Sequence, residues 1–147
     1  MQSKKPADSE VTAYQMVMPS HLNGGWCLFG GQLMSWIDLA AGAAACRHSG
    51  GQILTAACEV RFLSPARTGD LLKLAAKLSF AGESSMEVLV RVSRGPDTVA
   101  LARVTLVAVD NDGRPRPTPS LLPCTEGEKR DYAFAQRRYL KRKQAKS

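Results

Sequence analysis

The chain has 147 residues, which suits a single domain and argues against a second full catalytic domain. Hydrophobic residues make up 44% of it and charged residues 22%, which excludes a wholly disordered or collagen-like chain. The net charge of +7 is uneven, because residues 1–125 carry 12 Lys+Arg against 10 Asp+Glu, whereas residues 126–147 carry 8 against 3. The excess charge belongs to a C-terminal tail. We expect no nucleic-acid partner, since no aromatic stacking platform accompanies it.

The sequence also indicates the cellular location and the metal content. No apolar run approaches the roughly 18 residues of a membrane span, and the N-terminus lacks the apolar stretch of a signal peptide. We therefore expect a cytoplasmic protein without a membrane partner. The four cysteines form no C-x-x-C pair and only two histidines are present, so we expect reduced thiols, no bound metal and no cofactor.

The N-terminal third predicts one strand and one long helix. Residues 1–10 are polar and are expected to be disordered. Residues 11–17 form a short predicted strand, which Pro19 stops. Residues 32–47 are apolar on almost every side, which predicts a helix buried on most sides, and the Ser-Gly-Gly at residues 49–51 ends it.

The following residues predict a sheet. Hydrophobicity changes to an alternating pattern, with strands predicted at residues 53–63, 70–81, 85–94 and 98–110. Together the elements predict an α+β fold in which an antiparallel five-stranded sheet wraps around one long central helix. Because a five-stranded sheet with a long final strand can hide an edge by joining a second copy, we expect at least a homodimer.

The predicted organisation places the folded domain at residues 11–113. Residues 114–125 are rich in proline and are expected to form a linker. The basic tail at residues 126–147 predicts a polar, marginally stable helix that reaches about residue 143. Its cations form either a solvated helix face or a phosphate-binding arm, and the sequence leaves both interpretations open.

Asp38 is the strongest candidate catalytic residue. It is the only acidic residue within residues 11–58, and it lies in an apolar helix, where a carboxylate must be paired, solvated or lining a cavity. Gly31 precedes it by seven residues, which returns to nearly the same helix face. Free amides beside the Gly30 and Gly31 pair can stabilise a developing oxyanion, while Asp38 activates a water that a carboxamide such as Asn23 holds. The predicted reaction class is hydrolysis of an ester-like bond.

Short motifs follow one another in a specific order along residues 11–143. They are Met18-Pro19, His21-Leu22-Asn23, Phe29-Gly30-Gly31, Leu33-Met34-Ser35-Trp36-Ile37-Asp38, Thr55-Ala56, Phe62-Leu63-Ser64-Pro65, Gly69-Asp70, Gly82 with Ser84-Ser85, and Val109-Asp110. Each is weak alone, but their order and spacing together are specific. In these residues the chain resembles the hotdog-fold acyl-CoA thioesterases, particularly the bacterial short- to medium-chain acyl-CoA hydrolases and brain acyl-CoA hydrolase.

The resemblance implies an assembly and a mechanism. In that family two subunits join their sheets, dimers commonly assemble into hexamers as trimers of dimers, and the active site lies between subunits. Asp38 would act as general base or nucleophile, Asn23 of the partner subunit would position water or the thioester, and the Gly31 amide would polarise the carbonyl. The implied reaction hydrolyses fatty acyl-CoA to a free acid and coenzyme A without a cofactor.

The resemblance also implies where coenzyme A binds. Gly30 adjoins the proposed amide site, and Gly82, Ser84 and Ser85 match a turn that lies near the active site and the pantetheine arm. Neither serine is interpreted as a nucleophile, because neither has a nearby histidine signal. The cationic side chains that could contact the phosphates of coenzyme A are Arg67, Arg137, Arg138, Lys141 and Arg142.

Some alternatives stay open at this point. Trp26 stands where the family usually has glycine, so its indole either narrows the substrate channel or packs at the dimer surface. The main rival function is a hotdog domain that binds acyl-CoA without turnover. A dehydratase would need an active-site histidine, a pattern that His21 and His48 do not fit, and His48 is interpreted as a helix-dipole partner or a surface residue.

Overall fold

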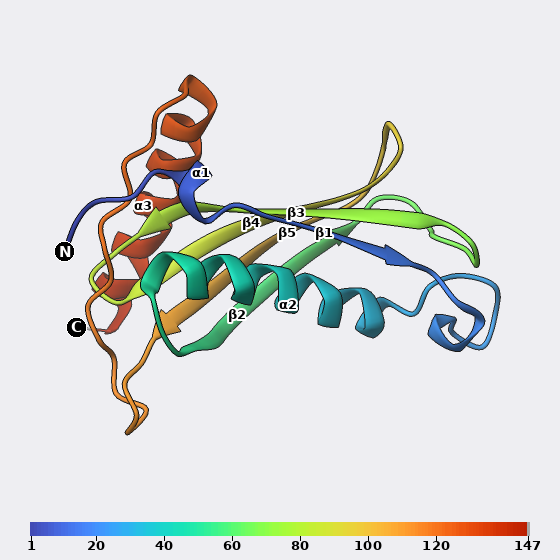
Figure 1. The fold of residues 1–147 in the computed structure, drawn as a ribbon, viewed down its shortest axis with the longest axis horizontal. Coiled ribbons are helices and arrows are strands. Elements are labelled where there is room, and N and C mark those ends of the chain that lie inside the picture. The colour runs from blue at the N-terminus through green and yellow to red at the C-terminus, as the bar shows by residue number, and fades with distance from the viewer. Residues whose placement is uncertain (147) are drawn as a thin grey trace.

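A computed structural model describes residues 1–146 of the chain. Its elements are α1 (Pro6–Ser9), β1 (Val11–Met16), the 3-10 helix η1 (Pro19–His21), α2 (Gly30–Ser49), β2 (Ile53–Phe62), β3 (Leu71–Ala81), β4 (Ser85–Arg94), β5 (Asp97–Ala108) and α3 (Glu126–Lys146). The strands form one antiparallel sheet in the order β1-β3-β4-β5-β2. Helix α2 runs along one face of this sheet (Figure 1), which confirms the predicted α+β architecture.

Helix α2 is the centre of the hydrophobic core, but only one side of it is covered. Small side chains at Ala40, Ala41 and Ala44 are buried and let the sheet pack closely against the helix. The opposite side is open, since Leu39 is 68% exposed. The expectation of a helix buried on most sides is therefore wrong for the single chain. Gly50 ends the helix in the left-handed region, at φ 79°, as its position after the apolar run predicted.

Strand β4 shows how the alternating pattern places residues on the two faces of the sheet. Met86 and Val88 lie in the core against α2, as the alternation predicted. Glu87 lies on the opposite face and is nevertheless buried, because α3 covers it. The sheet therefore buries residues on both faces at this end of the molecule.

The two edges of the sheet are β1 and β2. The long final strand β5 lies between β4 and β2, so the edge that a second copy could cover is not the last strand of the chain. Strand β2 has an exposed, partly apolar outer edge, with Leu54 57% exposed. An exposed edge of ten residues is an unstable feature in an isolated monomer.

The N-terminal segment is ordered, contrary to the prediction that residues 1–10 are disordered. The backbone of Lys4 bonds with Ser120 and Leu122, and its ammonium donates to the carbonyls of Arg47 and His48 at 3.0 Å each. These bonds satisfy carbonyls at the end of α2. The N-terminal segment and the proline-rich residues 114–125 therefore hold each other in place, a contact between distant parts of the chain that local composition does not reveal.

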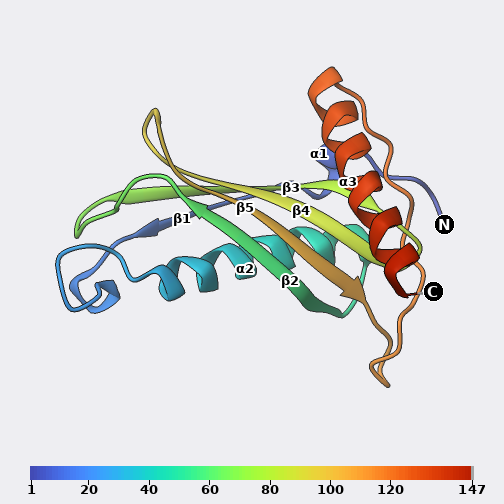
Figure 2. The ribbon, with the colours of Figure 1, turned by 180° about the vertical axis from the view of Figure 1, so that it is seen from behind.

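Helix α3 packs on the sheet face opposite α2 (Figure 2) and is not a solvated tail. The rings of Tyr132 and Tyr139 lie 5.0 and 5.1 Å from that of Phe80, measured between centroids. Thr125 and Glu128 form a reciprocal capping box at the start of the helix. The hydrogen bond from Lys77 to Glu128, with the amides at the helix start, lowers the pKa of that carboxyl to about 2.

Candidate active site

Asp38 lies on the open side of α2, facing the edge strand β2. The hydroxyl of Thr55 donates a hydrogen bond of 2.7 Å to Oδ1 of Asp38. This bond satisfies one carboxylate oxygen and orients the side chain, which leaves Oδ2 to accept a proton or a water hydrogen. The pair lies in an open groove between α2 and β2 that also contains Leu39, Gly42 and Ala43.

A β-bulge explains why Thr55 reaches the helix. The pairing of β2 with β5 shifts register between Thr55 and Ala57, so that Ala56 is the extra residue. The bulge places Thr55 and Cys58, three residues apart, toward the same helix, although simple alternation would separate them. Bulges of this kind re-aim a side chain, and they are over-represented next to active sites.

Cys58 follows Thr55 by three residues, and its thiol is not a suitable nucleophile. Burial, followed by the negative charges of Asp38 and Glu59, raises the pKa of its thiol. The reactive form of a cysteine is the thiolate, so a raised pKa keeps this side chain protonated and inert at neutral pH. The carboxylate of Asp38 is therefore a better candidate for chemistry than this thiol.

Helix α2 starts with amides that are available to a ligand. The amides of Gln32 and Leu33 bond to the carbonyl of Phe29, whereas no acceptor within residues 1–146 is recorded for the amides of Gly30 and Gly31. A side chain at Gly31 would place its Cβ only 2.5 Å from the Phe29 ring. Glycine is thus required for the Phe29 ring to fold back over the helix start, and free amides at this end attract negative charge.

Asn23 lies in the loop before α2 and is held by that loop. Its Oδ1 accepts a hydrogen bond from the amide of Gly25 at 2.8 Å, and its Nδ2 donates to the sulfur of Cys27 at 3.3 Å. The second hydrogen of Nδ2 is free for another acceptor. The carboxamide is therefore oriented before any substrate is present.

The structure does not bring all three predicted catalytic groups together in one chain. Gly31 precedes Asp38 by seven residues of helix, which separates them by about 10 Å along the axis. The loop that holds Asn23 lies at the Gly31 end of the helix (Figure 1). One chain therefore carries two half-sites: Asn23 with Gly31, and Asp38 with Thr55.

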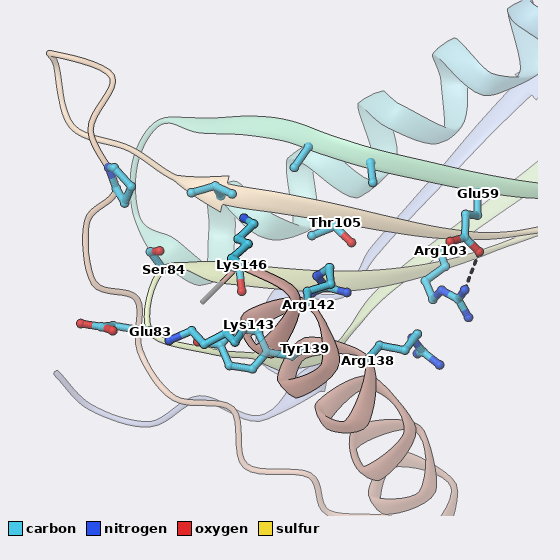
Figure 3. A pocket seen from close by; sticks show the side chains of 15 residues that line it. Glu59, Glu83, Ser84, Arg103, Thr105, Arg138, Tyr139, Arg142, Lys143 and Lys146 are labelled. Atoms are coloured by element: carbon cyan, nitrogen blue, oxygen red, sulfur yellow. Dashed lines mark hydrogen bonds and ion pairs between the residues drawn. The ribbon is translucent and has the colours of Figure 1, made fainter.

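A second cavity, of about 520 Å³, lies between α3 and the outer face of the sheet. Figure 3 shows Arg142, Lys143 and Lys146 on the last turns of α3, near the turn that carries Glu83 and Ser84. Ser85 also lines this cavity, and its buried hydroxyl has no hydrogen-bond partner within residues 1–146. The cavity thus combines the cations and hydroxyl groups that can bind a phosphate with two carboxylates, those of Glu59 and Glu83.

The predicted binding residues are distributed over separate places. Gly82 does not line the cavity but lies beneath Tyr139, where a Cβ would come within 2.7 Å of the ring. Arg138 borders the cavity, but two of its guanidinium nitrogens bond to Glu87 at 2.9 and 2.8 Å. Arg137 stacks on Phe134 instead.

Arg67 lies apart from the cavity beside α3. Its guanidinium stacks on the ring of Trp26, 4.5 Å from the centroid, although the indole itself is 56% exposed. The backbone bond from Leu28 to Ala66 holds the two loops together, so Arg67 belongs to the Asn23 half-site.

Sequence reasoning missed two residues that matter here. Thr55 was noticed only as part of a motif, because nothing in the local pattern reveals the bulge that directs it to Asp38. Glu87 lies on the polar face of the alternating pattern in β4, which gives no sign that it is buried and accepts hydrogen bonds from Arg138 and Ser79. An acidic residue in β4 could pair with a cation of the basic tail, but the sequence does not show that the tail packs on this sheet.

The described residues contain no further element that suggests a metal or membrane function. Within residues 1–146, no group of three or more His, Cys, Asp or Glu side chains is placed to hold a metal ion. Over the same residues, no helix combines the length and hydrophobicity that crossing a bilayer requires.

Comparison with known sequences identifies similar proteins. The sequence model of the thioesterase superfamily matches residues 27–101. An uncharacterized acyl-CoA thioester hydrolase of Bacillus subtilis is 36% identical over 146 residues, which covers 95% of this chain and 85% of that protein. The cytosolic acyl coenzyme A thioester hydrolase of Mus musculus is 31% identical over 144 residues, and the match covers 92% of this chain but 38% of that longer protein.

Solved structures agree with these sequence matches. An acyl-CoA hydrolase from Staphylococcus aureus, in complex with butyryl coenzyme A, coenzyme A and coenzyme A disulfide, superposes with a TM-score of 0.88 at 36% identity, covering 98% of this chain and 92% of that one. Structures of the same enzyme include variants in which one aspartate, one asparagine or one threonine is replaced by alanine. An apo-hexameric acyl-CoA thioesterase gives a TM-score of 0.90 at 34% identity over 100% of this chain and 99% of that one.

Proposed function

Because this chain belongs to the thioesterase superfamily and is similar to proteins named as acyl-CoA thioester hydrolases, we propose that it hydrolyses fatty acyl-CoA to a free acid and coenzyme A. The observation that carries the proposal is the Asp38–Thr55 pair, a carboxylate oriented by a 2.7 Å hydrogen bond in a groove open to solvent. A carboxylate in this position can activate water for attack on a thioester.

The substituted residues of the Staphylococcus aureus enzyme support the choice of residues. Its substituted aspartate lies 15 residues after the asparagine and 17 before the threonine. Asn23, Asp38 and Thr55 have the same residue types and the same separations of 15 and 17. The structure joins two of the three residues, Thr55 and Asp38, by a hydrogen bond.

In the proposed mechanism, Asp38 removes a proton from water as the water oxygen attacks the thioester carbon. The carbonyl oxygen becomes an oxyanion, which the Gly31 amide stabilises. Collapse of the tetrahedral intermediate breaks the carbon–sulfur bond, and the thiolate of coenzyme A takes the proton from Asp38. No metal or organic cofactor takes part in these steps.

A covalent route uses the same residues. Asp38 attacks the carbonyl carbon itself, expels the thiolate and forms a mixed anhydride, which water then hydrolyses. Turnover in isotopically labelled water distinguishes the two routes. The anhydride route leaves label in the Asp38 carboxylate when water attacks its carbonyl, whereas direct attack leaves label only in the acid product.

The separation of the half-sites requires two copies of the chain. A thioester carbonyl cannot contact Gly31 and Asp38 of one helix at once, because about 10 Å of helix separates them. We propose that one subunit provides Asn23 and Gly31 and its partner provides Asp38 and Thr55. The exposed β2 edge and the open side of α2 are the surfaces that a homodimer would cover, and a hexameric similar structure supports trimers of such dimers.

The cavity beside α3 is the proposed site for the phosphates of coenzyme A. Ser84, Ser85 and Arg142 can contact phosphate oxygens there. Arg138 can donate to a phosphate only through Nη1, because its Nε and Nη2 bond to Glu87. Of the predicted set, Arg67, Arg137 and Lys141 do not line this cavity. The phosphate-arm interpretation of the tail therefore applies to its last turns.

The experiment that tests the function measures free-thiol release from a panel of acyl-CoA esters with the wild type and Asp38→Ala. We expect turnover by the wild type, an unchanged oligomer in the variant, and loss of at least about a hundredfold in kcat/KM. Unchanged activity in Asp38→Ala would show that the catalytic assignment is wrong. Saturable binding of acyl-CoA without any thiol release by the wild type would instead favour the non-catalytic binding module.

A further inference from the structure

An apolar pocket of about 360 Å³ lies between the start of α2 and the end of β2. This volume is at the lower end of the range of about 300–1,000 Å³ that is typical of small-ligand sites. None of the side chains that line the pocket carries a charge. They are Cys27, Leu28, Leu33, Phe62, Leu63, Ser64, Pro65, Ala66 and Val99, with Gly30.

The pocket opens beside the amides that the mechanism uses. Gly30 forms part of its wall, and Gly31 is the next residue. The ring of Phe62 lies against this helix start, since a Cβ on Gly30 would be 3.5 Å from the ring atom Cζ. The pocket therefore begins one residue from the amide that would bind the thioester carbonyl.

Phe62 is held by the sheet and yet borders open space. It pairs with Ala100 at the end of β2, and 54% of its side chain is exposed. An aromatic ring that borders the pocket offers apolar surface to an acyl chain. The Asp38–Thr55 pair is several residues further along the same two elements, so the pocket is distinct from the carboxylate groove.

We propose that this pocket receives the acyl chain of the substrate and that Phe62 determines the chain length accepted. The inference rests on the proposed thioesterase function and specifies its substrate class. Because the lining has no cation, the acyl group is an unsubstituted aliphatic or aromatic one, and a terminal carboxylate would be buried without a partner. Acyl-CoA esters of dicarboxylic acids are therefore poor substrates.

Two substitutions at one position test the role of Phe62. The ratio of kcat/KM for long over short acyl-CoA is measured on esters from acetyl to palmitoyl. Phe62→Ala deepens the pocket, and we expect the ratio to rise by about tenfold or more, since each methylene in an apolar pocket changes selectivity by at least that factor. Phe62→Trp fills the pocket and is expected to lower the ratio. Opposite shifts cannot arise from a general loss of folding.

Leu71→Ala is the matched control, because Leu71 is also a half-exposed apolar strand residue but does not line the pocket. It should keep the wild-type chain-length profile. The assignment of the pocket would be overturned if both Phe62 variants kept that profile, or if succinyl-CoA were turned over as well as butyryl-CoA. A wild type that releases no thiol from any ester would contradict the proposed function itself, which separates the two failures.

Discussion

The hydrogen bond between Thr55 and Asp38 is the smallest feature on which the proposed activity depends. Thr55→Val removes the hydroxyl and keeps the shape of the side chain. A hydrogen bond to a charged group contributes about 1.5–3 kcal/mol, so we expect kcat/KM to fall by about tenfold or more if the bond persists in the transition state. Steady-state kinetics on one good acyl-CoA substrate measures this effect.

Thr12→Val is the control for that substitution, because Thr12 is an exposed strand residue on β1 far from the groove. It should retain the wild-type kcat/KM. If Thr55→Val also retained it, the orienting role of the hydroxyl would be refuted.

His48 determines a pH dependence of stability. The surface alternative for His48 is wrong, since the residue is completely buried in the last turn of α2 and its Nε2 lies 2.7 Å from the carbonyl oxygen of Pro119. Its Nδ1 has no hydrogen-bond partner within residues 1–146. Burial is the main cause that lowers the pKa of His48 below 6.5. The neutral imidazole is therefore the form that the folded state favours.

The sign of the effect follows from proton binding. Below pH 6.5 the unfolded chain binds a proton at His48 before the folded chain does, so the free energy of unfolding falls as the pH falls from 6.5 toward the lower folded pKa. Chemical denaturation at several pH values measures the slope. His48→Gln, which keeps a donor for Pro119, should flatten that slope; an equally steep slope in this variant would assign the dependence to other groups.

At the scale of elements, helix α3 is held to the sheet by a charge network around Glu87. This carboxylate is 3% exposed and accepts bonds from Arg138 and Ser79, while Arg103 lies within 3.8 Å. Such a pair is costly to break, because the remaining partner loses its counter-charge. The network explains why a helix of low hydrophobicity docks in a fixed position and shapes the cavity beside it.

Glu87→Gln tests this anchoring role. We expect the free energy of unfolding to fall by about 2–4 kcal/mol and the amides of α3 to exchange faster with solvent. The double variant Glu87→Leu with Arg138→Leu should recover most of the loss, because an apolar pair can replace a buried ion pair. Hydrogen exchange and denaturation measure both effects, and an α3 that exchanges as slowly in Glu87→Gln as in the wild type would contradict the anchoring role.

At the scale of the whole molecule, the shared site predicts complementation between inactive chains. In a dimer of one Asn23→Ala chain and one Asp38→Ala chain, one site has both substitutions and the other has neither. Random pairing of the two variants should therefore restore about a quarter of the wild-type activity. Thiol release before and after mixing refolded chains measures it. No activity in a mixture shown to contain heterodimers would mean that each site is built from one chain.

Periodicity was sufficient to predict most of the elements. The helix around residues 32–47 and the strand at 85–94 follow from patterns that repeat every 3.6 or two residues, and burial enforces those patterns. The ends differ, because α2 extends to Gly30 and Ser49 through residues that carry no periodic signal. Order in the first ten residues depends on Lys4 contacting the end of α2, which no local pattern contains.

The sequence by itself determined the fold class and singled out Asp38 and Gly31, because an isolated acid in an apolar helix and a glycine pair at its start are local anomalies. The role of Asn23 came from the resemblance to a known family. Tertiary structure decided which of these groups can act together. A bulge in β2 brings Thr55 to Asp38, and seven residues of helix hold Gly31 away from Asp38. Packing of α3 on the sheet pairs Arg138 with Glu87. Each depends on contacts between segments far apart in the chain, whose geometry is fixed only when the sheet and both helices pack together.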